Sequence, residues 1–111
     1  MMNLVLTHYI DIDMTTVAGR LEHAIGLGLD AAAERTAALR EDTVTTVVDR
    51  GVRVDRGVDA LNGSELRLSG DGQLTELTVA VPWHSTDSGT TKLWAANRFA
   101  GTVAGSLRPV A

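Results

Sequence analysis

The sequence predicts an α+β fold built on one antiparallel sheet of about five strands. Residues 3–13 alternate between apolar and polar side chains, as a half-buried strand does. Residues 13–41 carry apolar and alanine side chains at helical spacing, whereas Val, Thr and Gly alternate in short runs from Thr43 onward. Helical spacing returns over residues 93–107. The predicted order is an N-terminal strand, two intervening helices, a meander of strands and a C-terminal helix packed across the sheet.

Two helices are predicted between the first strand and the meander. Asp13 is the predicted N-cap of the first helix, because its carboxylate can accept a hydrogen bond from the first helical turn. Gly26 and Gly28 predict that this helix ends or kinks there. A second, alanine-rich helix is predicted over Ala31–Glu41, with Asp30 as its cap. Its apolar face is mostly alanine, so we expect it to pack closely but to bury little area.

The meander contains several turn signals, and Asn62-Gly63 is among them as a loop longer than two residues or bulged. The string Val-Asp-Arg-Gly-Val occurs at residues 48–52 and 54–58, and each copy predicts a turn or bulge in which the glycine supplies a positive φ. Asp71-Gly72 predicts a two-residue hairpin loop. That loop would set Leu68 opposite Thr75, which keeps the apolar side chains of both strands on one face.

The C-terminal helix is predicted from a stripe of apolar and small residues. It comprises Leu93, Ala96, Asn97, Ala100, Val103, Ala104 and Leu107, with Trp94 and Phe99 beside it. Gly101 and Gly105 lie four residues apart in this segment, and we expect them to allow close packing on the sheet. The polar stretch Ser85–Thr91 before the helix is predicted to be a loop.

Composition excludes several classes of function. The chain has 111 residues, enough for one domain spanning residues 1–111, and it has no cysteine, which excludes disulfides and thiolate chemistry. Its formal net charge of −4 gives no electrostatic footprint for nucleic acid or anionic lipid. No targeting segment or membrane-length apolar run is visible, so the sequence predicts a cytoplasmic protein with no nucleic-acid or membrane partner.

In the order of its elements the chain resembles the START-related polyketide cyclase and lipid-binding (SRPBCC) superfamily. The resemblance is carried by the strand of Leu4–Ile12 that enters a helix through Asp13, by the central meander, and by the closing Leu-Trp-Ala-Ala-Asn-Arg-Phe-Ala-Gly-Thr-Val-Ala helix. It implies a curved antiparallel sheet that grips the C-terminal helix around a hydrophobic ligand. The chain is shorter than typical members and has fewer strands than their seven. No catalytic residue of the family carries over.

Four residues are candidates for a ligand site. His8 falls on the apolar face of the first strand, where an imidazole lining a cavity could bind a polar group or act as acid or base. A structural histidine with a backbone partner is the competing interpretation. Trp83 and His84 follow the last strand, and Trp94 opens the last helix, where large aromatic rings either stack on a ligand or anchor the core.

No metal site or cofactor is predicted, and the catalytic residues are unknown. The three histidines show no metal-ligand spacing, and Asp11 and Asp13 are explained by a solvated strand face and a helix cap. The serines occur in no nucleophile-elbow sequence.

Three hypotheses of function remain open. The first is a small apolar ligand bound between the sheet and the last helix, touched by His8 and a tryptophan. The second is a structural or partner-binding protein without catalytic activity. The third is a cyclase- or isomerase-like enzyme that uses His8. With four aromatic residues and an alanine-rich helix the core is thin, so we also expect a homodimer that covers exposed apolar surface.

Overall fold

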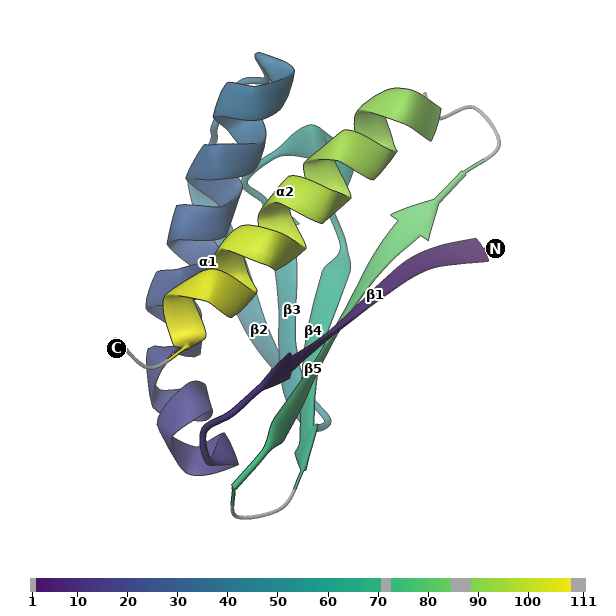
Figure 1. Cartoon of the computed structure of the whole chain (residues 1–111). Coiled ribbons are helices and arrows are strands. Elements are labelled where there is room, and N and C mark those ends of the chain that lie inside the picture. The colour runs from purple at the N-terminus through teal and green to yellow at the C-terminus, as the bar shows by residue number, and fades with distance from the viewer. Residues whose placement is uncertain (1, 71–72, 85–88, 109–111) are drawn as a thin grey trace.

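Five strands form an antiparallel sheet, and both helices lie on one face of it (Figure 1). The structure is a computed structural model that describes residues 2–70, 73–84 and 89–108. The elements are β1 (Met2–Ile10), α1 (Met14–Thr36), β2 (Thr43–Val48), β3 (Gly51–Arg56), a short 3-10 turn (Asp59–Leu61), β4 (Ser64–Gly70), β5 (Thr75–Trp83) and α2 (Gly89–Leu107). The predicted α+β class and five-stranded antiparallel sheet are confirmed.

The strand order in the sheet is β1-β5-β4-β3-β2. The last four strands are hairpin neighbours, so they form the predicted meander. The first strand pairs with the last, which brings Leu4 opposite Val81 and His8 opposite Leu77. The two edges of the sheet are therefore β1 and β2.

Strand alternation decides which face the helices cover. In β5, Thr75, Leu77, Val79 and Val81 are buried while the residues between them are partly exposed. In β4 the outward positions carry Glu65 and Arg67, which form an exposed ion pair of 3.4 Å. The apolar side chains of the sheet thus face the helices, and the outer face is polar.

α1 begins at the predicted cap. The Asp13 carboxylate accepts hydrogen bonds from the Thr16 backbone N–H at 3.0 Å and from the Thr16 hydroxyl at 2.7 Å. The hydroxyl bond, followed by the backbone bond, lowers the pKa of Asp13 from its ordinary value of 3.8. Asp13 is thus more stable as an anion in the folded chain.

Replacing Asp13 with alanine should destabilise the protein in a pH-dependent way. A carboxylate whose pKa is lower in the folded state stabilises that state above its unfolded pKa, and loses the effect as pH falls through the folded pKa. The thermal midpoint of Asp13→Ala should therefore lie below that of wild type by the largest amount at neutral pH, and this difference should shrink in acid. Asp11→Ala, at an exposed neighbouring carboxylate, is the control. A difference that stays constant into strong acid would contradict the lowered pKa.

The prediction of two intervening helices is wrong, because one helix runs from Met14 to Thr36. Gly26 and Gly28 lie inside it, and Gly28 is buried. A Cβ at Gly28 would lie 2.7 Å from a Val103 methyl and 2.8 Å from the Phe99 ring of α2. The glycine therefore permits close contact between the helices and does not break α1. Asp30, the expected second cap, instead forms an ion pair with Arg40 at 2.9 Å.

The hairpin of β4 and β5 has a different register from the predicted one. Leu68 pairs with Leu77, and Gly70 pairs with Thr75, so four residues separate the strands where two were expected. The shift is two residues, and because side chains alternate with a period of two, every residue keeps its face. The Asp71-Gly72 turn itself lies outside the described residues.

α2 begins at Gly89, four residues before the predicted stripe, and its buried face differs in part from that stripe. Phe99 is completely buried, whereas Leu93 is 41% exposed. Gly101 and Gly105 are exposed, and a Cβ at either would have no neighbour within 4 Å, so the expected close packing at these glycines is wrong. α2 packs mainly on α1 and also along β1.

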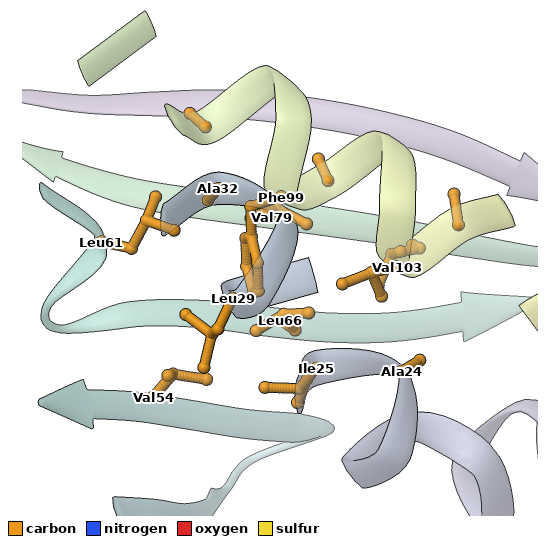
Figure 2. Packing of buried hydrophobic residues seen from close by; sticks show 14 of the residues in the cluster. Ala24, Ile25, Leu29, Ala32, Val54, Leu61, Leu66, Val79, Phe99 and Val103 are labelled. Atoms are coloured by element: carbon orange, nitrogen blue, oxygen red, sulfur yellow. The ribbon is translucent and has the colours of Figure 1, made fainter. Parts of the chain in front are cut away.

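The core lies between the two helices and the sheet. Figure 2 shows Ile25 and Leu29 of α1, and Phe99 of α2, converging on side chains of β3, β4 and β5. Four buried alanines of α2 and three of α1 keep the helices close together; they are Ala24, Ala32, Ala33, Ala95, Ala96, Ala100 and Ala104. The region between α2 and the other elements is filled, because Phe99 and Leu107 have no exposed surface.

Candidate functional site

A cleft of about 580 Å³ opens beside the N-terminal half of α1, on the face of the sheet that the helices cover. Three elements build it: α1, the turn between β2 and β3, and the end of β4. Its apolar lining comprises Met14, Ala18, Leu21, Val47, Val52 and Leu68. Glu22, Arg50 and Ser69 contribute polar groups, and Gly51 and Gly70 complete the lining.

The cleft lies beside α1 at a position where the helix presents the small side chain of Ala18. Ile25 and Leu29 fill the space above the sheet near the middle of the helix. Ala18 is the smallest of the α1 residues that line the cleft, and its methyl group leaves a space that a leucine would fill. Val52 and Leu68 point into this space because they occupy helix-facing positions of β3 and β4.

Two apolar side chains at the mouth of the cleft are left in water. Val47 lies on the helix-facing side of β2 and is 86% exposed, because no helix packs closely over this strand. Met14 at the start of α1 is 39% exposed. Covering such side chains with an apolar group stabilises the complex by roughly 25 cal/mol per Å² removed from water.

The floor of the cleft is held in place by the turn between β2 and β3. Arg50 has a φ of 61° in this turn, whereas the prediction assigned the positive φ to Gly51. Gly51 is required for a different reason, since a Cβ there would lie 1.9 Å from the Leu66 carbonyl oxygen. The backbone of β3 can therefore pass against β4 only at a glycine, which fixes the position of Arg50 at the rim.

The rim carries one group of each charge. Glu22 projects from α1 and Arg50 from the turn, and neither side chain makes a hydrogen bond or ion pair with any residue that the structure describes. The Ser69 hydroxyl is the third polar side chain. The site can thus offer an apolar surface together with a carboxylate, a guanidinium or a hydroxyl for the polar end of a ligand.

None of the four sequence-predicted site residues lines this cleft. His8 lies half-buried on the helix-facing side of β1, and its imidazole makes no hydrogen bond with the described residues. Trp83 ends β5, partly buried, with Gly89 of α2 close to its ring. His84 follows it and is exposed. Trp83 and His84 are chain neighbours at the end of β5.

Trp94 packs against a side chain of the other helix. Its ring is half-exposed on α2, and the guanidinium carbon of Arg35 on α1 lies 5.4 Å from the ring centroid. This cation–π contact joins the two helices on their outer surface. A shallow groove of about 300 Å³ beside it is lined by Arg35, Trp94, Asn97 and Arg98.

The residues that line the cleft were not found from the sequence. Arg50 belongs to the repeated Val-Asp-Arg-Gly-Val string, which indicates a turn but no ligand. Ala18 and Glu22 occur in an ordinary amphipathic helix. Among the residues that the structure describes, no three His, Asp or Glu side chains lie close enough together to hold a metal ion. None of the described helices has the length and apolar content needed to cross a membrane.

Comparisons of the chain with protein-family models, with curated proteins and with solved structures give no match. The functional argument therefore depends on the geometry of the cleft.

Proposed function

We propose that this protein binds a small apolar or amphipathic molecule in the cleft beside α1. The observation that carries the proposal is the combination of an apolar lining with a volume of about 580 Å³. Pockets that bind small molecules have volumes of about 300–1,000 Å³ and mostly apolar walls with a few polar groups. The cleft has both properties.

The exposed apolar side chains at the mouth favour binding over an empty cleft. Burial of each methylene of a ligand contributes about 0.8 kcal/mol, so a short alkyl chain or a ring system along Leu21, Val52 and Leu68 is sufficient for measurable affinity. Glu22 and Arg50 stand at the rim without partners among the described residues, and they suit the polar end of such a ligand. An amphipathic molecule fits this arrangement better than a purely apolar one.

The order of elements supports a START-like character for this binding protein. The first strand lies beside the last, and the chain closes with a helix on the covered face of the sheet. In the START-related superfamily the ligand lies between the sheet and the C-terminal helix. Here Phe99 and its neighbours fill that region, and the proposed ligand lies under α1 instead.

Ala18→Trp tests the proposal by filling the cleft. Ala18 is exposed and lines the cleft, so an indole there occupies ligand space without entering the core. We expect wild type to enhance the fluorescence of 8-anilinonaphthalene-1-sulfonate, an amphipathic aromatic anion, and Ala18→Trp to raise the dissociation constant of the dye by about tenfold or more. Tenfold corresponds to about 1.4 kcal/mol of binding free energy.

Leu27→Trp is the matched control, because it adds the same indole to an exposed site of α1 away from the cleft. It should bind the dye as wild type does. A second measurement is native mass spectrometry of protein purified without denaturation, where a retained small molecule should be absent from Ala18→Trp. Equal dye binding by wild type and Ala18→Trp would show that the dye binds elsewhere, and would reject the cleft as the site.

A further inference from the structure

A second groove lies between α1 and α2, away from the cleft. Each helix contributes three residues at positions i, i+3 and i+4, which lie on one helix face. On α1 these are Ala31, Glu34 and Arg35, and on α2 they are Trp94, Asn97 and Arg98. This interhelical groove has a deeper part of about 580 Å³ and a shallower part of about 300 Å³, and Arg35 and Arg98 line both parts.

The groove forms where the two helices diverge after a close contact. A Cβ at Gly28 would lie 2.8 Å from the Phe99 ring, so the helices are close together at that point. About one turn further along α1, Ala31 presents only a methyl group. Figure 1 shows the C-terminal end of α1 and the N-terminal end of α2 lying apart above the sheet. A small side chain between diverging helices leaves space for a bound molecule.

Two guanidinium groups line this groove without a carboxylate partner. Neither Arg35 nor Arg98 forms an ion pair or a hydrogen bond with any residue that the structure describes. Glu34 lines the same groove, and its carboxylate is in no ion pair with either of them. Like charges that line one groove repel each other, and a bound anion replaces this repulsion with attraction to both. The groove therefore favours an anion.

The indole of Trp94 adds an aromatic wall and holds one of the guanidinium groups in place. The guanidinium carbon of Arg35 lies 5.4 Å from the ring centroid, which is a cation–π contact. Trp94 is 51% exposed, so much of its ring remains accessible to a ligand. Asn97 donates a hydrogen bond to the Leu93 carbonyl at 3.0 Å, which orients its side chain. Side chains that are ordered before binding lower the entropy cost of holding a ligand.

We propose that the interhelical groove is a second binding site, for a small organic anion that carries a planar ring. The anionic group, a phosphate or a carboxylate, lies between Arg35 and Arg98, because guanidinium groups bind both oxyanions through paired N–H donors. The ring lies against the exposed part of Trp94. A ligand with the charge alone, or with the ring alone, does not use all three side chains.

This site is separate from the cleft beside α1. The two share no lining residue, and Ala31 lies about 20 Å beyond Ala18 along the helix at a rise of about 1.5 Å per residue. Ala18→Trp, which fills the cleft, should therefore leave binding in the interhelical groove unchanged. The dye used for the cleft is itself an aromatic anion. Dye binding that survives Ala18→Trp and is lost in Arg98→Gln would belong to the interhelical groove.

A nuclear magnetic resonance titration with phenyl phosphate tests the proposal. We expect the indole N–H signal of Trp94 to shift in a saturable way, while that of Trp83, the other tryptophan of the chain, stays in place. Trp94→Phe identifies the two signals. Inorganic phosphate, which lacks the ring, and benzyl alcohol, which lacks the charge, should each bind about tenfold more weakly. Equal binding of phenyl phosphate and either of these two probes would overturn the proposal.

Benzoate in place of phenyl phosphate decides which oxyanion the groove prefers. Saturable binding of either one at Trp94 supports the site, and binding of neither overturns it. Strong salt should weaken the binding, because the attraction between an exposed guanidinium and an anion is screened.

Substitutions of exposed residues test the two guanidinium groups without disturbing the core. Arg98→Gln and Arg35→Gln should each raise the dissociation constant of phenyl phosphate by about tenfold, since each removes one charge-assisted contact. Glu34→Gln should lower it, because a negative charge leaves the lining. Arg20→Gln is the matched control, at an exposed arginine of α1 that lines neither site. Arg98→Gln and Arg35→Gln that bind as wild type does, or an equal loss in Arg20→Gln, would reject the groove as the site.

Discussion

Phe99→Ala should lower the free energy of unfolding by about 3–5 kcal/mol, the cost observed when a buried phenylalanine is truncated. Phe99 has no exposed surface and is the largest of the completely buried side chains. Its ring lies against Gly28 of α1 and is packed in the cluster with Val79 of the sheet (Figure 2). Removing the ring leaves a cavity that two helices and a sheet cannot close without moving. Small domains have about 5–15 kcal/mol of stability, so this loss is a large fraction of it.

The measurement is urea unfolding followed by circular dichroism, with Leu93→Ala as the control. Leu93 lies on the same helix and belongs to the stripe that spacing predicts to be buried, yet it is 41% exposed. Leu93→Ala should cost less than about 1 kcal/mol, because part of its side chain is already in water. If the two substitutions lowered the free energy of unfolding equally, the face of α2 that carries Phe99 would not be the one that packs into the core.

β1, β4 and β5 could be predicted from sequence because each alternates between a more buried and a more exposed face. In β1 the predicted inner face is the one that faces the helices; it carries Leu4, Leu6, His8 and Ile10. The even-numbered residues hold most of the apolar side chains of this strand, so these residues must point inward if the strand is to bury them. The register of β4 against β5 could not be predicted in the same way. Registers that differ by two residues bury the same side chains, so alternation does not distinguish them and the length of the turn decides.

Features that depend on contact between distant segments were missed. Lys92, the single lysine of the chain, is buried on α2 and donates a hydrogen bond to the Pro82 carbonyl at 2.8 Å. Trp94 contacts Arg35 of the other helix, and nothing in the local sequence indicated this contact. Both residues looked unremarkable or ligand-like in sequence because their partners lie in other elements.

The cleft could not be predicted for the same physical reason. Its lining comes from α1, the turn between β2 and β3, and the end of β4, which are far apart in the chain. No local motif marks it, since Ala18 is an ordinary helix residue and Val47 an ordinary strand residue. The site results from the place where α1 lies on the sheet and from its distance to β2. Spacing in the sequence predicts the elements but not that placement.

Gly28→Ala should destabilise the protein even though alanine is the better helix former. The new methyl group would lie 2.7 Å from a methyl of Val103, 2.8 Å from the ring of Phe99 and 3.1 Å from the Phe99 carbonyl oxygen. Both side chains are completely buried and have no free space to move into. Overpacking of this kind costs about 1–3 kcal/mol. This overpacking cost outweighs the gain of about 1 kcal/mol in helix propensity that alanine has over glycine.

Gly26→Ala is the matched control, because it lies in the same helix two residues earlier and a Cβ there has no neighbour within 4 Å. It should therefore raise the free energy of unfolding by up to about 1 kcal/mol, through helix propensity alone. The two variants carry the same chemical change and should shift the urea midpoint in opposite directions. If Gly28→Ala stabilised the protein as much as Gly26→Ala, α1 and α2 would have to lie farther apart than the contact at Gly28 requires. The glycine would then be a residue that the helix tolerates, and the close approach of the two alanine-lined helices would have to be explained by the alanines only.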